Sequence, residues 1–511
     1  MCRLLFTTSP EIDKNSFLSS LELMAHGGPD APCCYFEVNN FKFGHNRLAI
    51  LDLDKRSNQP FISKDKRYLL IYNGEIYNYK ELAKQYSINL NTNCDTELLL
   101  ELGIKMGFEN ILNDLNGMFS FVFFDTYTSE FFAARDRLGV KPLYYYRHRD
   151  DFIFSSEINA IVNLLNNNVE IDEVGIRQYK KLRTFFNEHT IYKDIKMFPA
   201  GCFMQKEQIR KYWELPPGHQ EPPSDEELRY LIYSAVQYRK ITDVPLGSYL
   251  SGGLDSTIVA AITKELHTWT VGFADNNEFE WGRIASRSIG SCHHEIFTDS
   301  EQFIEDAKML ISKRREPLSV PNEVLLYQMT REVKKENTVV LCGEGADELF
   351  FGYDRIFQWA YSTKCFDIKE FSRRYSYGSN DDLEIVESVV EPFYKYGSPL
   401  DIVAAFFQIA HLHGLLRRLD NSTMMCAVEA REPFVDYRLI QRMAGVPFEW
   451  RIKNGIVKAP LKRVFADIVP KEIIGREKIG FPVSLADIFH ISKEKAFDHW
   501  FEFNIKELKS L

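Results

Sequence analysis

The first part of the chain alternates short apolar runs with turn signals, as strands joined by tight loops do. Such runs predict strands at residues 2–7, 41–51, 68–72, 119–125, 130–135 and 152–155. Two stretches with the apolar spacing of a helix, 79–85 and 96–106, lie between them. We therefore expect this half to contain stacked sheets covered by helices.

The pattern changes after a proline-rich stretch. Residues 215–227 read LPPGHQEPPSDEE, and four prolines with a cluster of acids are typical of a linker. Beyond it, strands alternate with amphipathic helices, as in a parallel sheet, and the end of the chain is mostly helical. We expect a first domain over residues 1–200, a linker over 201–227 and a second domain over 228–511.

The composition is that of an ordinary globular protein. The 511 residues, 45% hydrophobic and 26% charged, suffice for about two to four domains. The net charge of −10 argues against a nucleic-acid-binding protein, which usually carries a basic face. No stretch reaches the ~18 consecutive apolar residues of a membrane span, since the best candidate, 402–410, is short and is followed by His411 and His413.

Targeting and cysteine signals both favour the cytoplasm. The amino terminus has no charged region leading into an apolar run, so no signal peptide is expected. The nine cysteines are an odd number without CxxC pairs, which fits reduced thiols better than disulfides or a zinc site. Cys292, His293 and His294 form the one compact cluster of soft ligands, and we do not expect it to hold a metal.

A cysteine at position 2 introduces the first candidate chemistry. If Met1 is removed, Cys2 carries a thiol and a free α-amine, whose pKa of about 7.7 to 8.0 suits it to act as general base for the thiol. Taken alone, such a cysteine is more often a structural residue of a first strand. The short motifs HGGPD, RLAI, NGE, CDTE and GMFSF follow it along the chain, and together they indicate a thiol nucleophile at a chain terminus.

The second half has its own sharp motif, SGGLDS, at residues 251–256. It stands between an apolar run and a helical pattern, where a glycine pair lets backbone amides converge on an anion. The motif lacks the GKS or GKT of the P-loop. Its hydroxyls instead suit a pyrophosphate held as a unit, with Asp255 available for Mg²⁺.

A second strand, loop and helix follow at residues 338–353, TVVLCGEGADELFFGY. Glu344 lies between two glycines, and Asp347 and Glu348 begin the helix. Acids in a helix's first turn are often only favourable partners of its dipole. Beside SGGLDS, however, this loop is predicted to contribute to a site for Mg²⁺ and a general base.

In this order, the motifs resemble the asparagine synthetase family over nearly the whole chain. The family joins a class II glutamine amidotransferase domain to an ATP pyrophosphatase type synthetase domain. The resemblance implies an α+β, Ntn-hydrolase-like αββα sandwich for residues 1–200. For residues 228–511 it implies an α/β parallel-sheet ATP pyrophosphatase domain with a helical carboxyl-terminal part. It further implies a carbon–nitrogen ligase that uses ATP and Mg²⁺.

For the first half, the resemblance implies a glutaminase. Cys2 would attack the side-chain amide of glutamine, assisted by its own amine, to give a γ-glutamyl thioester and ammonia. Asn73 and Gly74 would form the oxyanion hole, where removing one donor typically costs about 10² to 10³ in rate. The implied glutamine pocket comprises Arg47, Leu48, Ala49, Ile50, Leu51, Asn73, Gly74, Glu75 and Asp95. Arg47 would pair with the α-carboxylate, and the two acids would hold the α-amine.

For the second half, the resemblance implies an adenylation site. The implied ATP-binding residues are Leu250, Ser251, Gly252, Gly253, Leu254, Asp255, Ser256, Val271, Cys342 and Gly343. Asp255 and Asp347 would hold Mg²⁺ on the departing pyrophosphate. Lys458 would neutralise charge in the transition states, and Glu344 would deprotonate the ammonia adduct. Two further segments, EAREPFVD at 429–436 and REKIGFP at 476–482, resemble the family's EVRVPFLD and RKKxGFP and would build and close the site.

The implied reaction is ATP-dependent amidation. A carboxylate becomes an acyl-adenylate with release of pyrophosphate, and ammonia then displaces AMP. Ammonia is expected to travel inside the protein, because free ammonia at pH 7 is mostly protonated and no longer nucleophilic. The expected partners are small molecules (glutamine, ATP and a carboxylate), with no nucleic acid and no membrane, and relatives often form homodimers.

Departures from the family pattern bear on the glutaminase and on the acceptor. The usual HRGPD is His26, Gly27, Gly28, Pro29 and Asp30 here, so an arginine near the glutamine pocket is missing. Cys342 stands where the family has serine before GEG. PLSVPN at 317–322 and DNSTM at 420–424 replace the PFADPS and DRMSM of many relatives, and the first lies where the acceptor pocket is expected.

Aspartate is therefore the default acceptor, with asparagine as the product. The alternative is another carboxylate, such as a sugar uronic acid of surface polysaccharides. A β-lactam synthetase is disfavoured because such relatives have no need of Cys2 and its pocket. A non-catalytic relative that keeps the fold is the competing class, and the intact nucleophile and nucleotide loops argue against it.

Overall fold

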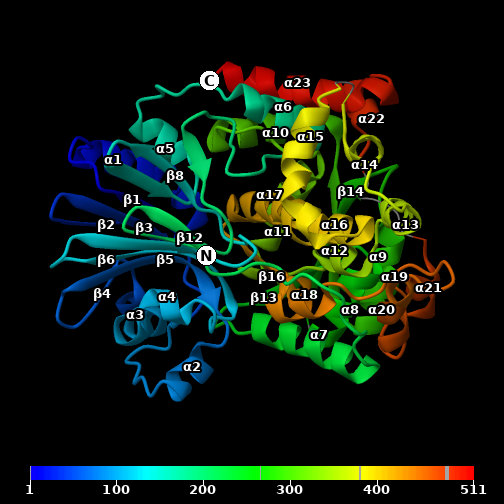
Figure 1. Cartoon of the computed structure of the whole chain (residues 1–511), viewed down its shortest axis with the longest axis horizontal. Helices are drawn as coiled ribbons and strands as arrows, with labels where there is room; N and C mark the ends of the chain where they lie inside the picture. Colours follow the sequence, from blue (N-terminus) through cyan, green and yellow to red (C-terminus); the bar gives the residue numbers. More distant parts are fainter. Residues whose placement is uncertain (1, 265, 379–380, 478–482) are drawn as a thin grey trace.

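The amino-terminal half contains two six-stranded antiparallel sheets stacked face to face (Figure 1). The computed structural model describes residues 2–264, 266–378, 381–477 and 483–511. The first sheet has the order β10-β8-β9-β1-β3-β2, with bounds Ile195–Met197, Tyr144–His148, Asp151–Ser155, Arg3–Thr7, Phe41–Arg47 and Ala31–Val38. The second has the order β12-β11-β7-β6-β5-β4, with bounds Gln208–Lys211, Cys202–Gln205, Glu130–Arg135, Gly117–Asp125, Tyr68–Ile76 and Phe61–Ile62.

The core between these sheets is built by alternate residues of the facing strands. Leu4 and Phe6 of β1 pack with Ile71 of β5 and Phe124 of β6, and all four are fully buried. Successive side chains of a strand point to opposite faces, so the other face of each sheet carries helices. Helices α1 (Lys14–Glu22) and α5 (Ile158–Leu164) contact the first sheet, and α3 (Asp95–Met106) contacts the second. The predicted αββα sandwich is confirmed.

The linker region differs from its prediction at both ends. Strands β11 and β12 lie after residue 200 and extend the second sheet, because β11 pairs with β7 and β12 pairs with β11. At the other end, SDEE begins helix α7 (Asp225–Arg239): the Ser224 hydroxyl accepts from Glu227 N at 3.1 Å, and the acids occupy the first turn. Residues that composition assigns to a linker therefore begin a helix, which is stabilised by the serine cap and by acids near its positive end.

The second half is built on a five-stranded parallel sheet of order β15-β14-β13-β16-β17. The strands span Cys292–Thr298, His267–Phe273, Leu246–Tyr249, Val339–Leu341 and Glu429–Arg431. Along β16, Val339 and Leu341 pack with α7 and α8 (Leu254–Thr263), whereas Val340 packs with α10 (Ser300–Arg314) and α11 (Asn322–Val333). Helices thus cover both faces, as predicted for an α/β domain.

Helices dominate the end of the chain, as predicted. A continuous helical segment runs through α16 (Pro399–Phe406), a π turn and α17 (Leu412–Met424). Among the described residues, this segment alone is long and apolar enough to cross a membrane, but 61% of its most apolar window is buried inside the protein. It also carries the buried Arg417 and Asp420, which are paired with other buried side chains, as in the core helix of a folded domain.

Candidate functional site

Cys2 immediately precedes β1, one of the two central strands of the first sheet, and is buried. Its main-chain nitrogen, which becomes the α-amine when Met1 is removed, donates to Asn73 Oδ1 at 3.2 Å. Its Sγ lies 4.0 Å from the carbonyl oxygen of Leu48. Burial raises the pKa of the Cys2 thiol, so the thiolate forms readily only when a base takes the proton.

Asn73 and Gly74 lie on β5, directly beside Cys2. Asn73 is fully buried, and its Nδ2 has no hydrogen-bond partner among the residues that the structure describes. A Cβ at position 74 would lie 2.2 Å from the Met118 carbonyl oxygen, so only glycine fits between β5 and β6 there. The site thus offers an unused buried donor next to a thiol, as an oxyanion hole requires.

Arg47 organises the loop that carries the RLAI motif. Its guanidinium donates to the carbonyl oxygens of Leu51 at 3.1 Å and Asp54 at 2.9 Å, and to Asn58 Oδ1 at 2.9 Å. The predicted strand 41–51 therefore ends at Arg47, and residues 48–51 form a loop. Ala49 N donates to Asp30 Oδ2 at 2.8 Å, which joins RLAI to HGGPD.

Glu75 and Asp95 form a buried acidic pair beside this loop. Asp95, at the start of α3, accepts from the Tyr72 hydroxyl and from Ile76 N, each at 2.8 Å. Burial raises the pKa of both acids, and the charge of Asp95 raises that of Glu75 further. Arg431 Nη2 lies 3.5 Å from Glu75 Oε1 and opposes the rise. A cationic amine would relieve the same repulsion, so the pair suits the α-amine of an amino acid.

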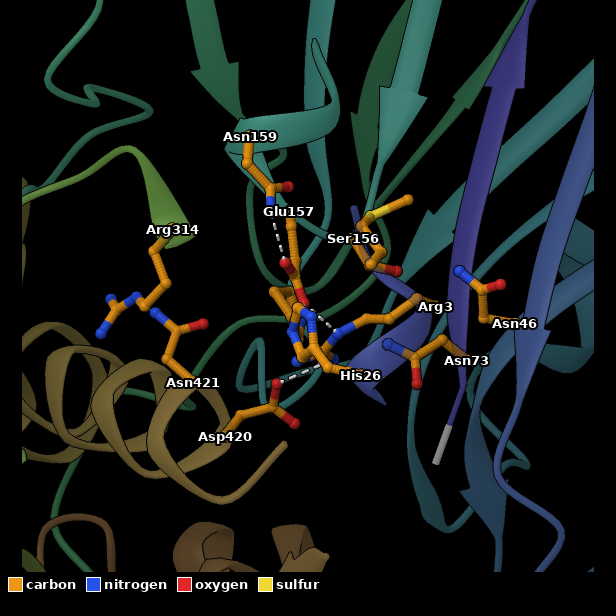
Figure 2. Close-up of polar contacts among 12 residues, drawn as sticks. Arg3, His26, Asn46, Asn73, Ser156, Glu157, Asn159, Arg314, Asp420 and Asn421 are labelled. Carbon is orange, nitrogen blue, oxygen red and sulfur yellow. Dashed lines mark hydrogen bonds and ion pairs between the residues drawn. The ribbon is translucent and has the colours of Figure 1, made fainter. Parts of the chain in front are cut away.

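The space beside Gly27 is filled by Arg3, whose polar contacts Figure 2 shows. Arg3 is fully buried, and its guanidinium donates to Glu157 at 2.6 Å and to Asp420 at 3.1 Å. His26 contacts the same Glu157 oxygen at 3.0 Å. An arginine next to the nucleophile thus links the first half of the chain to α17 of the second, a contact that no motif in the sequence indicates.

A large cavity opens at the carboxyl ends of β13, β14 and β16, where open α/β sheets bind their ligands. Its volume is about 780 Å³. Most predicted ATP-binding residues line it: Leu250, Ser251, Gly253, Asp255, Ser256, Val271, Cys342 and Gly343. Gly252 and Leu254 belong to the same loop but do not line the cavity.

The SGGLDS loop has the conformation expected of an anion-binding turn. Gly252 has a φ of +70°, and a Cβ there would lie 2.3 Å from the backbone of Trp281. Gly253 N donates to Ser251 Oγ at 3.2 Å, and Gly253 caps helix α8. The second loop packs against this turn so closely that a Cβ on Gly343 would lie 2.7 Å from Ser256 N. Both loops therefore face one cavity, as predicted.

Lys458 joins the two candidate metal ligands. Its Nζ contacts Asp255 Oδ2 and lies 2.5 Å from Asp347 Oδ1. Although burial opposes the effect, the two carboxylates raise the pKa of Lys458 above its ordinary value. Because one ammonium reaches both carboxylates, their oxygens converge, and an oxygen donor pair of this kind fits Mg²⁺.

Sequence comparisons assign the two halves of the chain to two different family models. Residues 1–213 match the family model described as glutamine amidotransferase domain, and residues 227–502 match the model described as asparagine synthase. The chain belongs to the asparagine synthase family. The predicted family is therefore confirmed, as is the prediction of an enzyme of the glutamine-hydrolysing asparagine synthase type.

Curated relatives cover most of the chain. Asparagine synthetase [glutamine-hydrolyzing] 1 of Bacillus subtilis is 30% identical over 91% of this chain and 83% of its own length. Putative asparagine synthetase [glutamine-hydrolyzing] 2 of Methanocaldococcus jannaschii is 34% identical over 67% of this chain and 73% of its own length. The asparagine synthetase of Gallus gallus is 29% identical over 92% and 82%, respectively.

Four arginines that no sequence motif indicates line the large cavity. Arg418 of α17 donates to Glu344 at 3.2 Å and to Asn322, in the divergent PLSVPN segment, at 3.2 Å. The other arginines that line the cavity are Arg183, Arg355 and Arg374. They come from separate helices and loops, so no sequence spacing marks them. In the REKIGFP segment, Arg476 donates to Gly252 O at 3.1 Å, and residues 478–482 lie outside the described residues.

Proposed function

We propose that this protein is a glutamine-dependent amide ligase that converts aspartate to asparagine. One observation carries the proposal: the same chain holds a buried thiol against an unused amide donor and, in its second half, a cavity in which Lys458 joins Asp255 to Asp347. The first arrangement suits hydrolysis of glutamine, and the second suits activation of a carboxylate by ATP.

In the proposed glutaminase step, the α-amine of Cys2 takes the thiol proton. The thiolate attacks the side-chain carbonyl of glutamine, and Asn73 Nδ2 with the backbone of Gly74 stabilises the oxyanion. As the adduct collapses to a thioester, the Cys2 α-ammonium gives its proton to the leaving nitrogen, which departs as ammonia. Water then hydrolyses the thioester, which releases glutamate and restores the thiol. The Leu48–Leu51 loop with Arg47 forms the wall of the pocket, while Glu75 and Asp95 receive the α-amine of the substrate.

In the proposed synthetase step, ATP lies along the SGGLDS loop, Val271, Cys342 and Gly343. A carboxylate oxygen of the acceptor attacks the α-phosphorus, and pyrophosphate leaves. Mg²⁺ held by Asp255 and Asp347 would neutralise charge on the departing pyrophosphate. Lys458 stabilises the same negative charge from the protein. Ammonia then attacks the acyl carbon, AMP leaves, and Glu344 receives the proton that the adduct loses.

The arrangement of the chain supports further proposals. Two functional domains meet in the irregular stretch between β12 and α7, with the glutaminase before it and the synthetase after it. We further propose that the protein acts in the cytoplasm, on small molecules, as a homodimer. We favour aspartate over other carboxylates as the acceptor. Arg418, Arg183 and Arg355 line the cavity and suit a substrate with a second carboxylate.

A panel assay tests the proposal. The protein is incubated with ATP, Mg²⁺ and glutamine or ammonium, and with aspartate or other carboxylates including a sugar uronic acid, and amides are identified by mass. Asparagine formation from both nitrogen sources, with pyrophosphate release, is expected. If another amide formed and asparagine did not, the acceptor would be a different carboxylate and the proposed mechanism would stand. Release of neither glutamate nor pyrophosphate would overturn the proposed ligase function.

A further inference from the structure

Two metal-binding side chains begin adjacent strands of the parallel sheet, and a third lies beside them. His267 is the first residue of β14, and Cys292 is the first residue of the edge strand β15. The parallel register pairs His267 with Cys292 and Trp269 with His294. Because successive side chains of a strand point to opposite faces, His267, Cys292 and His294 lie on the same face. The fold thus brings together two histidines that are 27 residues apart in the sequence.

His293 points to the opposite face, where both of its ring nitrogens have partners. Its Nδ1 lies 3.0 Å from the Thr268 hydroxyl, and its Nε2 lies 3.3 Å from the Thr270 hydroxyl. His293 therefore does not join its sequence neighbours Cys292 and His294 in a set of ligands. His267, from the neighbouring strand, takes that place.

The three ligand atoms lie close to the separations of a tetrahedral zinc site. His267 Nδ1 lies 2.9 Å from His294 Nε2, and Cys292 Sγ lies 3.8 Å from the same Nε2. All three atoms lie within 4.8 Å of one another. With Zn–N bonds of about 2.0–2.1 Å and a Zn–S bond of about 2.3 Å, two nitrogens lie about 3.3 Å apart, and a nitrogen and a sulfur about 3.6 Å apart. Small side-chain movements therefore suffice to bind the ion.

Aromatic stacking holds the two imidazoles in place. The ring centroid of His294 lies 5.2 Å from that of His267 and 5.2 Å from that of Trp269, with interplanar angles of 11° and 16°. Trp269 is buried and anchors the stack. Ligands that are already held in position lose less freedom when they bind. Cys292 is exposed, so an ion can reach the site from solvent.

We propose that His267 Nδ1, Cys292 Sγ and His294 Nε2 bind one Zn²⁺ ion, with water as the fourth ligand. Thiolate and imidazole are ligands that zinc prefers, whereas Mg²⁺ prefers oxygen. On binding, the Cys292 thiol releases its proton to solvent. The nitrogen that donates the hydrogen bond between the two imidazoles also loses its proton, and the other nitrogen of that ring takes one up, so both ligand nitrogens present lone pairs. Zn²⁺ keeps its oxidation state throughout.

The ion would bridge the edge strand β15 to β14 at the point where both strands begin. Because the ligands are assembled only in the folded protein, binding should stabilise the folded state. Trp269 lines the ATP cavity, but none of the three ligands does. The inference is therefore independent of the proposed ligase function, and its failure would leave that function untouched.

Equilibrium dialysis of the full, reduced chain against Zn²⁺ tests the proposal, with excess Mg²⁺ present to compete at the carboxylates of Asp255 and Asp347. Wild type should bind one Zn²⁺ that Cys292→Ser and His294→Gln bind at least about 10- to 100-fold more weakly, the typical cost of losing even a group that supports a ligand. Cys365→Ser removes an exposed thiol elsewhere, so it is the matched control and should bind like wild type.

Two further measurements identify the ligands and exclude misfolding. A Co²⁺ ion bound to thiolate gives an ultraviolet charge-transfer band, which wild type should show, Zn²⁺ should remove and Cys292→Ser should lack. Zn²⁺ should raise the urea midpoint of wild type but not that of Cys292→Ser, whereas both proteins should unfold alike in EDTA because Cys292 is exposed.

Three outcomes would overturn the site. Wild type could bind no more Zn²⁺ than Cys292→Ser does, or the Co²⁺ band could persist in Cys292→Ser. Equal weakening of binding in Cys365→Ser would show that Zn²⁺ binds adventitiously to exposed thiols.

Discussion

Arg3 occupies the space that a side chain at position 27 would fill. A Cβ on Gly27 would lie 2.9 Å from Arg3 Cγ and 3.0 Å from Arg3 Nε. The family's HRGPD has arginine at position 27, so this chain carries its guanidinium on the strand next to Cys2 instead. There it pairs with Glu157 and with Asp420 of the second half.

Restoring the family arginine at position 27 should therefore destabilise the protein. In Gly27→Arg two large side chains compete for one buried space, and overpacking of this kind costs about 1–3 kcal/mol of unfolding free energy. Adding Arg3→Gly vacates that space and should recover part of the loss. Urea unfolding of the two single variants and the double variant measures the coupling. Additive effects would show that the residues do not share the space.

The pair of Glu157 with Arg3 and His26 should make stability depend on pH in the acid range. Although burial opposes it, His26 and Arg3 hold the pKa of Glu157 at about 2, whereas an unfolded glutamate has a pKa of about 4.3. The stability that Glu157 contributes is thus complete above about pH 4.3 and is lost as pH falls towards about 2. The difference in unfolding free energy between wild type and Glu157→Gln should shrink between pH 5 and pH 3, and a constant difference would contradict this assignment.

Cys2→Ala should separate the two activities. The variant lacks the nucleophile, so glutamate release and glutamine-dependent amide formation should fall to background. Ammonium-dependent amide formation should continue, because the ATP cavity lies in the other half of the chain. Both products are measured by mass in paired reactions. Loss of the ammonium-dependent activity as well would show that Cys2 also supports the synthetase half.

Lys458→Met should abolish synthesis from either nitrogen source. Without the ammonium group, Asp255 and Asp347 repel each other and the charge on pyrophosphate is unmatched, so pyrophosphate release should fall by about 10² to 10³, as for loss of one key electrostatic group. Lys453→Met, an exposed lysine of the same segment, is the control and should behave as wild type. An unchanged rate in Lys458→Met would remove this lysine from the mechanism.

The elements that the sequence predicts well are those with strong local patterns. The strands at 119–125 and 130–135 and the helices at 79–85 and 96–106 are found within two residues of their predicted bounds, because each alternates or repeats apolar residues at the period of its structure. Strands β2 and β12 have mixed patterns with exposed positions, and β11 is a run of only four residues, so the local pattern does not mark them. Among the described residues, β2 and β12 lie at sheet edges, and each pairs only with the strand next to it in the sequence, β3 and β11 respectively.

The two halves, the family, and the motif residues around Cys2 and in the two nucleotide loops can be predicted from the sequence alone, because each of those signals is a short run of neighbouring residues. The fold is needed to see that Arg3 fills the place beside Gly27, that Arg418 reaches Glu344, and that Lys458 joins Asp255 to Asp347. These relationships join residues that are remote along the chain, and their distances are set by how sheets and helices pack. A packed interior can bring any two such residues together, and no spacing in the sequence records it.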